Sequence, residues 1–130
     1  MSSYRTPLSR ARGHGAAREG AHHWLAERLS AVALVPLVLW GVFGVIHLAA
    51  GDYQTAVVWL SEIQNLVLMV IMVAVGFWHM HAGMRVIVED YIQKTFSRVS
   101  LLILNLFVCV LAGSLAIFSL IRVALLGGAL

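Results

Sequence analysis

The stretch Trp78–Tyr91, which reads WHMHAGMRVIVEDY, decides how the rest of the chain is interpreted. It begins inside a long apolar run and ends where charged residues return. It therefore carries two histidines to membrane depth and brings an acidic residue and a tyrosine to the membrane surface. Ionisable side chains inside a membrane are rare and indicate a functional site by default. His79 and His81 are thus the first candidates for chemistry.

The composition is that of a membrane protein. Of the 130 residues, 61% are hydrophobic and 12% are charged, whereas a soluble domain carries about 25% charged residues. Three apolar runs, at about 29–50, 63–88 and 99–123, are each long enough to cross a hydrocarbon core of ~30 Å. We therefore predict an all-α membrane protein with three transmembrane helices, forming a single membrane domain over residues 1–130.

The N-terminal segment 1–28 is a basic tail, rich in arginine and glycine and poor in acidic residues. It resembles the start of a signal peptide, but the apolar run that follows exceeds the ~7–15 residues of a signal-peptide core. We interpret that run as a retained span. An acid-poor organellar presequence is the alternative interpretation of the tail.

The basic residues predict the orientation in the membrane. Eight of the nine lie in the tail, near the end of the second span or in the loop expected at 89–98, and only Arg122 lies at the opposite end. The positive-inside rule places the N-terminus and that loop in the cytoplasm (or matrix) and the C-terminus on the periplasmic side. The net charge of +3 is then explained by topology and by contacts with anionic lipids rather than nucleic acid. The eight residues are Arg5, Arg10, Arg12, Arg18, Arg28, Arg85, Lys94 and Arg98.

Two classes of redox chemistry are excluded for this chain alone. Its single cysteine, Cys109, cannot hold an iron–sulfur cluster or form an intrachain disulfide. No glycine fingerprint for a dinucleotide is present either.

The two histidines cannot share one partner. His79 lies about 9–11 residues from the cytoplasmic end of its span, or roughly 14–17 Å deep, and His81 is about 200° further around the helix. A neutral imidazole at this depth needs a partner, for which haem iron is one interpretation. The other is a hydrogen bond to a neighbouring helix, with Gly76 and Gly83 as close-packing positions. Spacing alone chooses neither between these interpretations nor between the two histidines.

A second haem ligand is not evident within the chain. His47 lies near the outer end of the first span, on the order of 15 Å or more from His79 in depth, which is too far for two ligands of one iron. We interpret His47 as an interfacial polar residue. His22 and His23 lie at the inner interface and are shallow. If His79 binds haem, its trans ligand must come from another subunit, so the sequence predicts a partner chain.

Asp90 and Tyr91 follow the second span at the cytoplasmic interface. A tyrosine there is commonly part of the aromatic belt, and an aspartate beside Arg85 or Lys94 is commonly a solvated ion pair. The functional alternative is a quinone site, in which the phenol donates to a quinone carbonyl and the carboxylate tunes or relays protons. The residues alone favour the belt interpretation.

One known family shares this pattern. The series His79-x-His81-x-Gly83 followed by Asp90-Tyr91, with Gly20-Ala21-His22 and Arg28 upstream, resembles the D-type membrane-anchor subunit of succinate dehydrogenase (complex II). The ubiquinone-reducing branch of bacteria and mitochondria is the most similar. The resemblance covers most of the chain, and the His-x(10)-Asp-Tyr spacing is its most specific part. It implies the bacterial cytoplasmic membrane, with the mitochondrial inner membrane as the alternative.

The resemblance also implies roles for individual residues. His79, eleven residues before Asp90, would be the axial ligand of haem b. Tyr91 would hydrogen-bond the ubiquinone carbonyl, with Asp90 next to that site. Arg28 would lie near the haem propionates, because guanidinium and carboxylate groups pair well. His22 would lie near the same interface.

The partners implied are a C-type cytochrome b anchor subunit that supplies the other haem ligand, an iron–sulfur subunit, and a flavoprotein subunit that oxidises succinate. This chain would anchor them and would not oxidise succinate itself. One alternative is the anchor of another b-type quinone oxidoreductase, such as a fumarate reductase; two-haem versions need four membrane histidines at paired depths, which this chain lacks. The other is a small non-redox membrane protein, in which His79 would only pack.

Overall fold

The computed structural model describes residues 6–8 and 20–127. Four of the tail arginines on which the predicted orientation rests, at positions 5, 10, 12 and 18, lie outside the described residues. The described part contains four helices of nine residues or more: α2 (Gly20–Leu48), α3 (Tyr53–Ser61), α4 (Ile63–Tyr91) and α5 (Thr95–Leu126). Helices α2, α4 and α5 are long and apolar enough to cross a membrane. The predicted all-α membrane fold with three spanning helices is confirmed.

The helices extend beyond the apolar runs that predicted them. Helix α4 continues through Asp90 and Tyr91, and only residues 92–94 separate it from α5, where the sequence predicted a loop over 89–98. The backbone N–H of Ile92 still donates to Val88 O at 3.1 Å. No glycine or proline interrupts residues 84–94, so the helix can leave the hydrocarbon core without a break.

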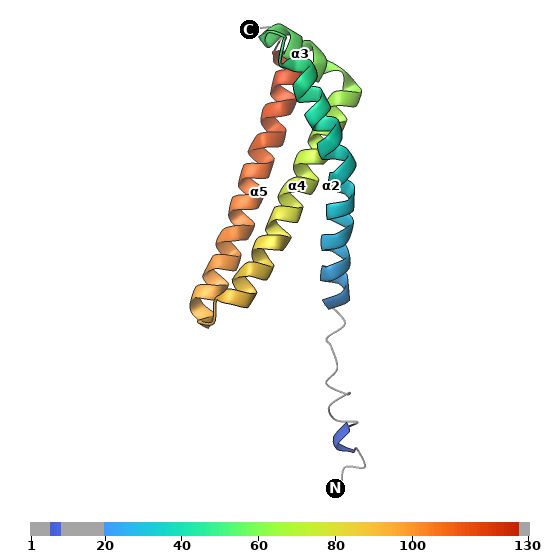
Figure 1. Cartoon of the computed structure of the whole chain (residues 1–130). Helices are drawn as coiled ribbons and strands as arrows, with labels where there is room; N and C mark the ends of the chain where they lie inside the picture. The colour runs from blue at the N-terminus through green and yellow to red at the C-terminus, as the bar shows by residue number, and fades with distance from the viewer. Residues whose placement is uncertain (1–5, 9–19, 128–130) are drawn as a thin grey trace.

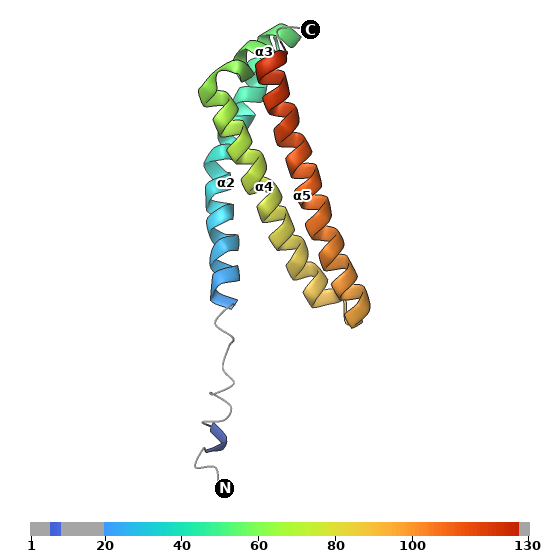
Figure 2. The same ribbon diagram turned by 180° about the vertical axis from the view of Figure 1, so that it is seen from behind.

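Helix α4 lies in the middle of the bundle (Figures 1 and 2). It packs against α2 and α5, while α3 lies across one end and packs against α4 and α5. The long helices alternate in direction, and α2 diverges from α4 and α5 toward the end that carries the start of α2 and the 92–94 connector (Figure 1). That alternation puts the start of α2 and the connector at one end and residues 49–62 and the end of α5 at the other. Which end faces the cytoplasm stays a prediction.

The face of α2 that packs against the bundle repeats every three or four residues, as expected of a helix with one contact stripe. Glycines on it allow close approach. An added Cβ on Gly41 would lie 3.0 Å from Met72 Sδ, and one on Gly44 would lie 3.1 Å from the Trp59 ring. Trp59 also stacks on Trp40, with ring centroids 5.5 Å apart. The helix continues across its internal proline. The partly or fully buried stripe comprises Ser30, Leu34, Leu37, Gly41, Gly44 and Leu48.

Polar contacts fix the end of the bundle that carries α3. Asp52 caps α3, because its Oδ1 accepts from the backbone N–H and the hydroxyl of Thr55, each at 2.8 Å. These hydrogen bonds to the charged form hold the pKa of the Asp52 carboxyl below 3.8. The Ser61 hydroxyl lies 2.7 Å from Val57 O and 2.9 Å from Ala124 O, which connects α3 to α5. Residues between the first two spanning helices therefore form a short helix that is held against α5.

The predicted orientation can be tested with two exposed glutamines at opposite ends of the bundle, Gln54 and Gln93. We expect Gln93→Cys to be labelled by a membrane-impermeant maleimide only from the cytoplasmic side, and Gln54→Cys only from the opposite side. The native Cys109 is buried and provides the unlabelled background. The reverse pattern in right-side-out and inverted vesicles would show that the positive-inside assignment is wrong.

The contact between α4 and α5 depends on Gly113. An added Cβ there would lie 3.2 Å from Phe77 Cγ and 3.4 Å from Phe77 Cβ, which are ring-base atoms with little freedom to move. We expect Gly113→Val to lower the free energy of unfolding by about 1–3 kcal/mol through overpacking. Leu115→Val is the matched control, because Leu115 is exposed on the same helix. Thermal unfolding of the complete complex in detergent would measure both, and equal midpoints would show that this contact is not tight.

Candidate functional site

The two candidate histidines lie on opposite contact faces of α4. The Nδ1 atom of His79 is 2.9 Å from the Oγ of Ser30 on α2. The Nδ1 atom of His81 is 3.0 Å from the Nδ2 of Asn105 on α5. Both rings are half-buried. The expectation that the two cannot face one partner is confirmed, since each contacts a different neighbouring helix.

The hydrogen bonds of Ser30 determine which nitrogen of His79 carries the proton. Ser30 is buried, and its Oγ is 2.9 Å from Glu27 O as well as from His79 Nδ1. A carbonyl oxygen only accepts, so the single hydroxyl hydrogen of Ser30 goes to Glu27. The Oγ must then accept from the Nδ1–H of His79. That tautomer leaves a lone pair on Nε2, which forms no hydrogen bond within the described part of the chain.

The hydrogen bonds of Asn105 give His81 the opposite tautomer. The Nδ2 of Asn105 donates to the backbone oxygen of His81 at 3.0 Å. If the amide were flipped, its oxygen would face that carbonyl oxygen, which is also an acceptor. Cys109 Sγ donates to the Oδ1 of Asn105 at 3.4 Å, consistent with the same amide orientation. The second hydrogen on Nδ2 therefore goes to the lone pair of His81 Nδ1. The proton of His81 is then on Nε2, so neither ring nitrogen is a free ligand.

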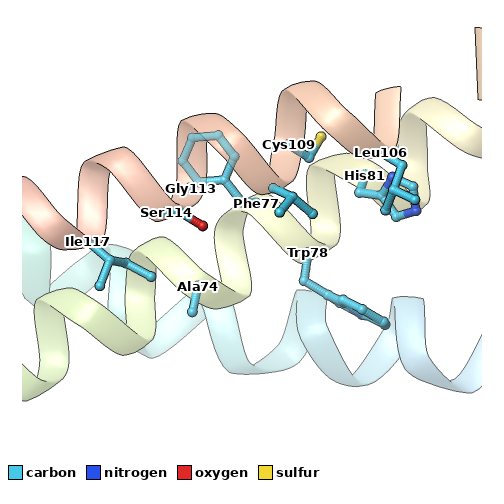
Figure 3. Close-up of a pocket in the computed structure, with 10 residues that line it drawn as sticks. Ala74, Phe77, Trp78, His81, Leu106, Cys109, Gly113, Ser114 and Ile117 are labelled. Atoms are coloured by element: carbon cyan, nitrogen blue, oxygen red, sulfur yellow. The ribbon is translucent and has the colours of Figure 1, made fainter. Parts of the chain in front are cut away.

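His81 lines an apolar groove of about 410 Å³ between α4 and α5 (Figure 3). Cys109 and Gly113 border the groove from α5, and Phe77 and Trp78 border it from α4. Its lining is almost entirely apolar, so a charged or strongly polar ligand would not be stabilised there.

Gly76 and Gly83 do not have the close-packing role that one of the two interpretations of the histidines gave them. An added Cβ at either position would meet nothing within 4 Å. The glycines that pack closely are elsewhere, at Gly41, Gly44 and Gly113. Because Gly76 and Gly83 lie three residues before and four residues after His79, they share its face of α4. They leave open space on both sides of the imidazole along the helix.

The structure does not bring Arg28 or His22 into contact with His79. Arg28 is exposed, and its guanidinium lies over the ring of Trp24 at 5.7 Å from the centroid. It precedes Ser30 by two residues, so it lies close to the depth of the His79 contact but about 200° around α2. His22 is exposed and lies further out along the same helix.

Asp90 and Tyr91 form a separate group at the end of α4. Both are exposed, Tyr91 to 80%. The ion pair of this turn joins Arg85 Nε to Glu89 Oε1 at 2.7 Å, and Asp90 forms none with any residue that the structure describes. Tyr91 is twelve residues beyond His79, or about 18 Å along the helix axis. A group bound at Tyr91 and a group bound at His79 would therefore be neighbours rather than the same ligand.

His47 lies at the opposite end of α2, where it is exposed. It is seventeen residues beyond Ser30, or about 25 Å along the axis. This agrees with the prediction that His47 and His79 cannot bind one iron together. Within residues 6–8 and 20–127, no group of three or more histidine, cysteine, aspartate or glutamate side chains is arranged to hold a metal ion.

Comparison with known proteins identifies the family of this chain. Residues 2–121 match the model of the succinate dehydrogenase/fumarate reductase transmembrane subunit. The chain belongs to this family. Similar proteins include the succinate dehydrogenase hydrophobic membrane anchor subunits of Rickettsia conorii, 29% identical over 82% of this chain and 86% of the relative, and of Rickettsia bellii, 32% identical over 77% and 80%. The succinate dehydrogenase membrane anchor subunit of Reclinomonas americana is 31% identical over 63% and 71%. No solved structure matches the chain.

Ser30 and Asn105, the hydrogen-bond partners of the two histidines, were not selected from the sequence as site residues. Each is a polar residue inside a long apolar run, and that alone marks a candidate at membrane depth. Their pairing with particular histidines required knowledge of which faces of α4 meet α2 and α5.

Proposed function

We propose that this chain is the hydrophobic membrane-anchor subunit of a succinate:ubiquinone oxidoreductase. Family membership supports this, as do relatives whose names describe succinate dehydrogenase anchors. Most large apolar side chains of the three long helices remain exposed, so their surfaces are available to lipid and to partner helices. In this role the chain holds the flavoprotein and iron–sulfur subunits at the membrane, and succinate oxidation takes place on the flavoprotein.

We further propose that His79 is an axial ligand of one haem b, shared with a C-type cytochrome b anchor subunit that provides the other ligand. The single observation that carries this is the hydrogen bond between Ser30 and His79 Nδ1, which leaves the Nε2 lone pair unused. Gly76 and Gly83 add open space for a flat group on the same face. The residues present therefore fit a haem. When bound, haem b accepts and donates single electrons.

Arg28 and His22 are proposed to act at the edge of this site rather than at the iron. Arg28 is an exposed cation near the depth of Ser30, suited to pairing with a propionate. Its contact with Trp24 is an exposed cation–π interaction, worth about 0.5–1 kcal/mol, which a propionate can outcompete. His22, closer to the start of α2, is suited to the same interface.

Tyr91 and Asp90 are proposed to form this chain's part of the ubiquinone site. Their exposure at the end of α4 supports this, because a phenol donor and a carboxylate at that end would be accessible to the head group of a lipid-soluble quinone. The phenol would donate to a quinone carbonyl, and the carboxylate would help to deliver protons as the ring is reduced. The predicted orientation places this end on the side where the iron–sulfur subunit would dock.

A tagged copy of the chain, purified in mild detergent from its own membranes, tests the assignment. We expect three further subunits to co-purify, including a flavin-bearing one, together with succinate-dependent reduction of a water-soluble ubiquinone analogue. The reduced-minus-oxidised spectrum should show a b-type haem. Recovery of the intact chain without flavin or haem, from membranes that retain succinate–quinone reductase activity, would contradict the proposal. The family model also covers fumarate reductase, but the names of the relatives favour succinate oxidation.

A further inference from the structure

We infer that Ser30 is a positioning residue for the haem ligand, and that Asn105 prevents His81 from taking that role. This inference rests on the proposed haem-binding function of His79. Ser30 holds the proton of His79 on Nδ1, and Asn105 holds the proton of His81 on Nε2. The choice between two histidines only two residues apart is then made by hydrogen bonds from α2 and α5, not by α4 itself.

A histidine binds iron through a ring nitrogen that carries no proton, and the other nitrogen then donates to an acceptor that fixes the ring. Ser30 is such an acceptor, and the hydroxyl hydrogen that it gives to Glu27 O increases its accepting strength. The relay runs from His79 Nδ1–H to Ser30 Oγ–H to the Glu27 carbonyl. It moves electron density toward the imidazole and should make Nε2 a stronger donor to ferric iron.

Burial of Ser30 makes this contact persistent. Ser30 is 8% exposed, lies on the stripe of α2 that faces the bundle, and has both of its hydrogen bonds at 2.9 Å. In surroundings of low dielectric constant, an unpaired Nδ1–H would carry a desolvation penalty. The imidazole is thereby held against α2 in one orientation, with Nε2 directed away from Ser30.

The arrangement around His81 has the opposite effect. Asn105 uses both hydrogens of its amide on His81, and Cys109 occupies its oxygen. For His81 to bind a metal through Nε2, the proton would have to move to Nδ1, where it would face an N–H donor. His81 is therefore unable to replace His79 while Asn105 is in place.

The test compares Ser30→Thr with Ser30→Val in the assembled complex. Threonine and valine have nearly the same shape, and only threonine keeps the hydroxyl that can bond Glu27 O and accept from His79. We expect Ser30→Thr to resemble wild type in haem-to-flavin ratio, midpoint potential and the ferric haem g-values in electron paramagnetic resonance. Ser30→Val should raise the midpoint potential, shift the g-values, and weaken haem retention about tenfold or more, as is typical when a ligand's hydrogen-bond partner is lost.

Ser30→Ala and Asn105→Leu complete the design. Ser30→Ala removes the hydroxyl without adding volume, so it should reproduce the spectroscopic shift of valine even if valine perturbs packing. Asn105→Leu removes the contacts with His81 and Cys109 but none with His79, so it should leave the g-values and potential of the haem unchanged. Wild-type spectra in Ser30→Val and Ser30→Ala, or equal losses in threonine and valine, would overturn the positioning role. Haem binding that survives His79→Ala would instead overturn the proposed function itself.

Discussion

Replacement of His79 by alanine is expected to remove the haem b signal from the assembled complex, whereas His81→Ala should retain it. The iron would lose a ligand at His79, a larger loss than the 10- to 100-fold typical of a group that only supports a ligand. His81 cannot compensate, since its Nδ1 already accepts from Asn105 and its ring lies on the face of α4 that meets α5. A reduced-minus-oxidised spectrum, normalised to flavin, measures the effect.

The two substitutions are well matched as a pair. Each removes one half-buried imidazole from the same helix and one hydrogen bond to a neighbouring helix. A general loss of packing would therefore lower the haem content in both variants. A signal lost only in His81→Ala would move the ligand to the α4–α5 side and contradict the tautomer assignment. Equal loss in both variants, with the subunits still assembled, would indicate a structural rather than a ligating role for His79.

The sequence predicted the fold well because length and hydropathy are nearly sufficient for a membrane helix. In hydrocarbon, an apolar run of this length must satisfy its backbone within the helix, so the three runs could hardly adopt another structure. The ends of the helices were harder to place. Charged and polar residues such as Glu89 and Asp90 do not stop a helix once it reaches the headgroup region, and α4 includes both.

The sequence predicted the histidines of the candidate site but not their hydrogen-bond partners on the neighbouring helices. The period of the helix placed His79 and His81 on different faces of α4 without any tertiary information. The helical rise likewise excluded His47 as the second ligand of an iron bound to His79. One of the two interpretations of the histidines gave Gly76 and Gly83 a packing role, whereas the glycines that contact neighbouring side chains closely are others. Which glycine packs depends on helix crossing positions, and the partners Ser30 and Asn105 depend on them too. A periodic pattern identifies faces within a helix but does not pair faces between helices.

Much of the apolar surface of the bundle is exposed, so its stability depends on what covers it. The described residues include few buried side chains, and α2 diverges from α4 and α5 toward the end of the bundle where α4 ends (Figure 1). A bundle with so small an interior is stabilised by whatever covers its surface, which in this family includes other subunits as well as lipid. Variants at exposed positions should therefore be judged in the complete complex.

Replacement of Tyr91 by phenylalanine is expected to lower succinate–ubiquinone reductase activity by about tenfold or more. The phenol is proposed to donate to a quinone carbonyl on which negative charge develops, and a hydrogen bond to a charged group contributes about 1.5–3 kcal/mol. Since about 1.4 kcal/mol corresponds to a factor of ten in rate, the lower end of that range already gives tenfold. The side chain is 80% exposed, so loss of its hydroxyl should leave the fold of this chain intact.

Tyr53→Phe is the matched control for this measurement. Tyr53 is also an exposed tyrosine, 60% accessible, but it begins α3 at the opposite end of the bundle. Both variants should oxidise succinate at the wild-type rate with a water-soluble artificial acceptor that bypasses the quinone, and only Tyr91→Phe should slow when a ubiquinone analogue is the acceptor. Equal quinone reduction by the two variants would leave Tyr91 as a residue of the interfacial aromatic belt. A decrease in Tyr53→Phe alone would move the quinone site to the end of the bundle that carries α3, and with it the side of the membrane on which protons are taken up.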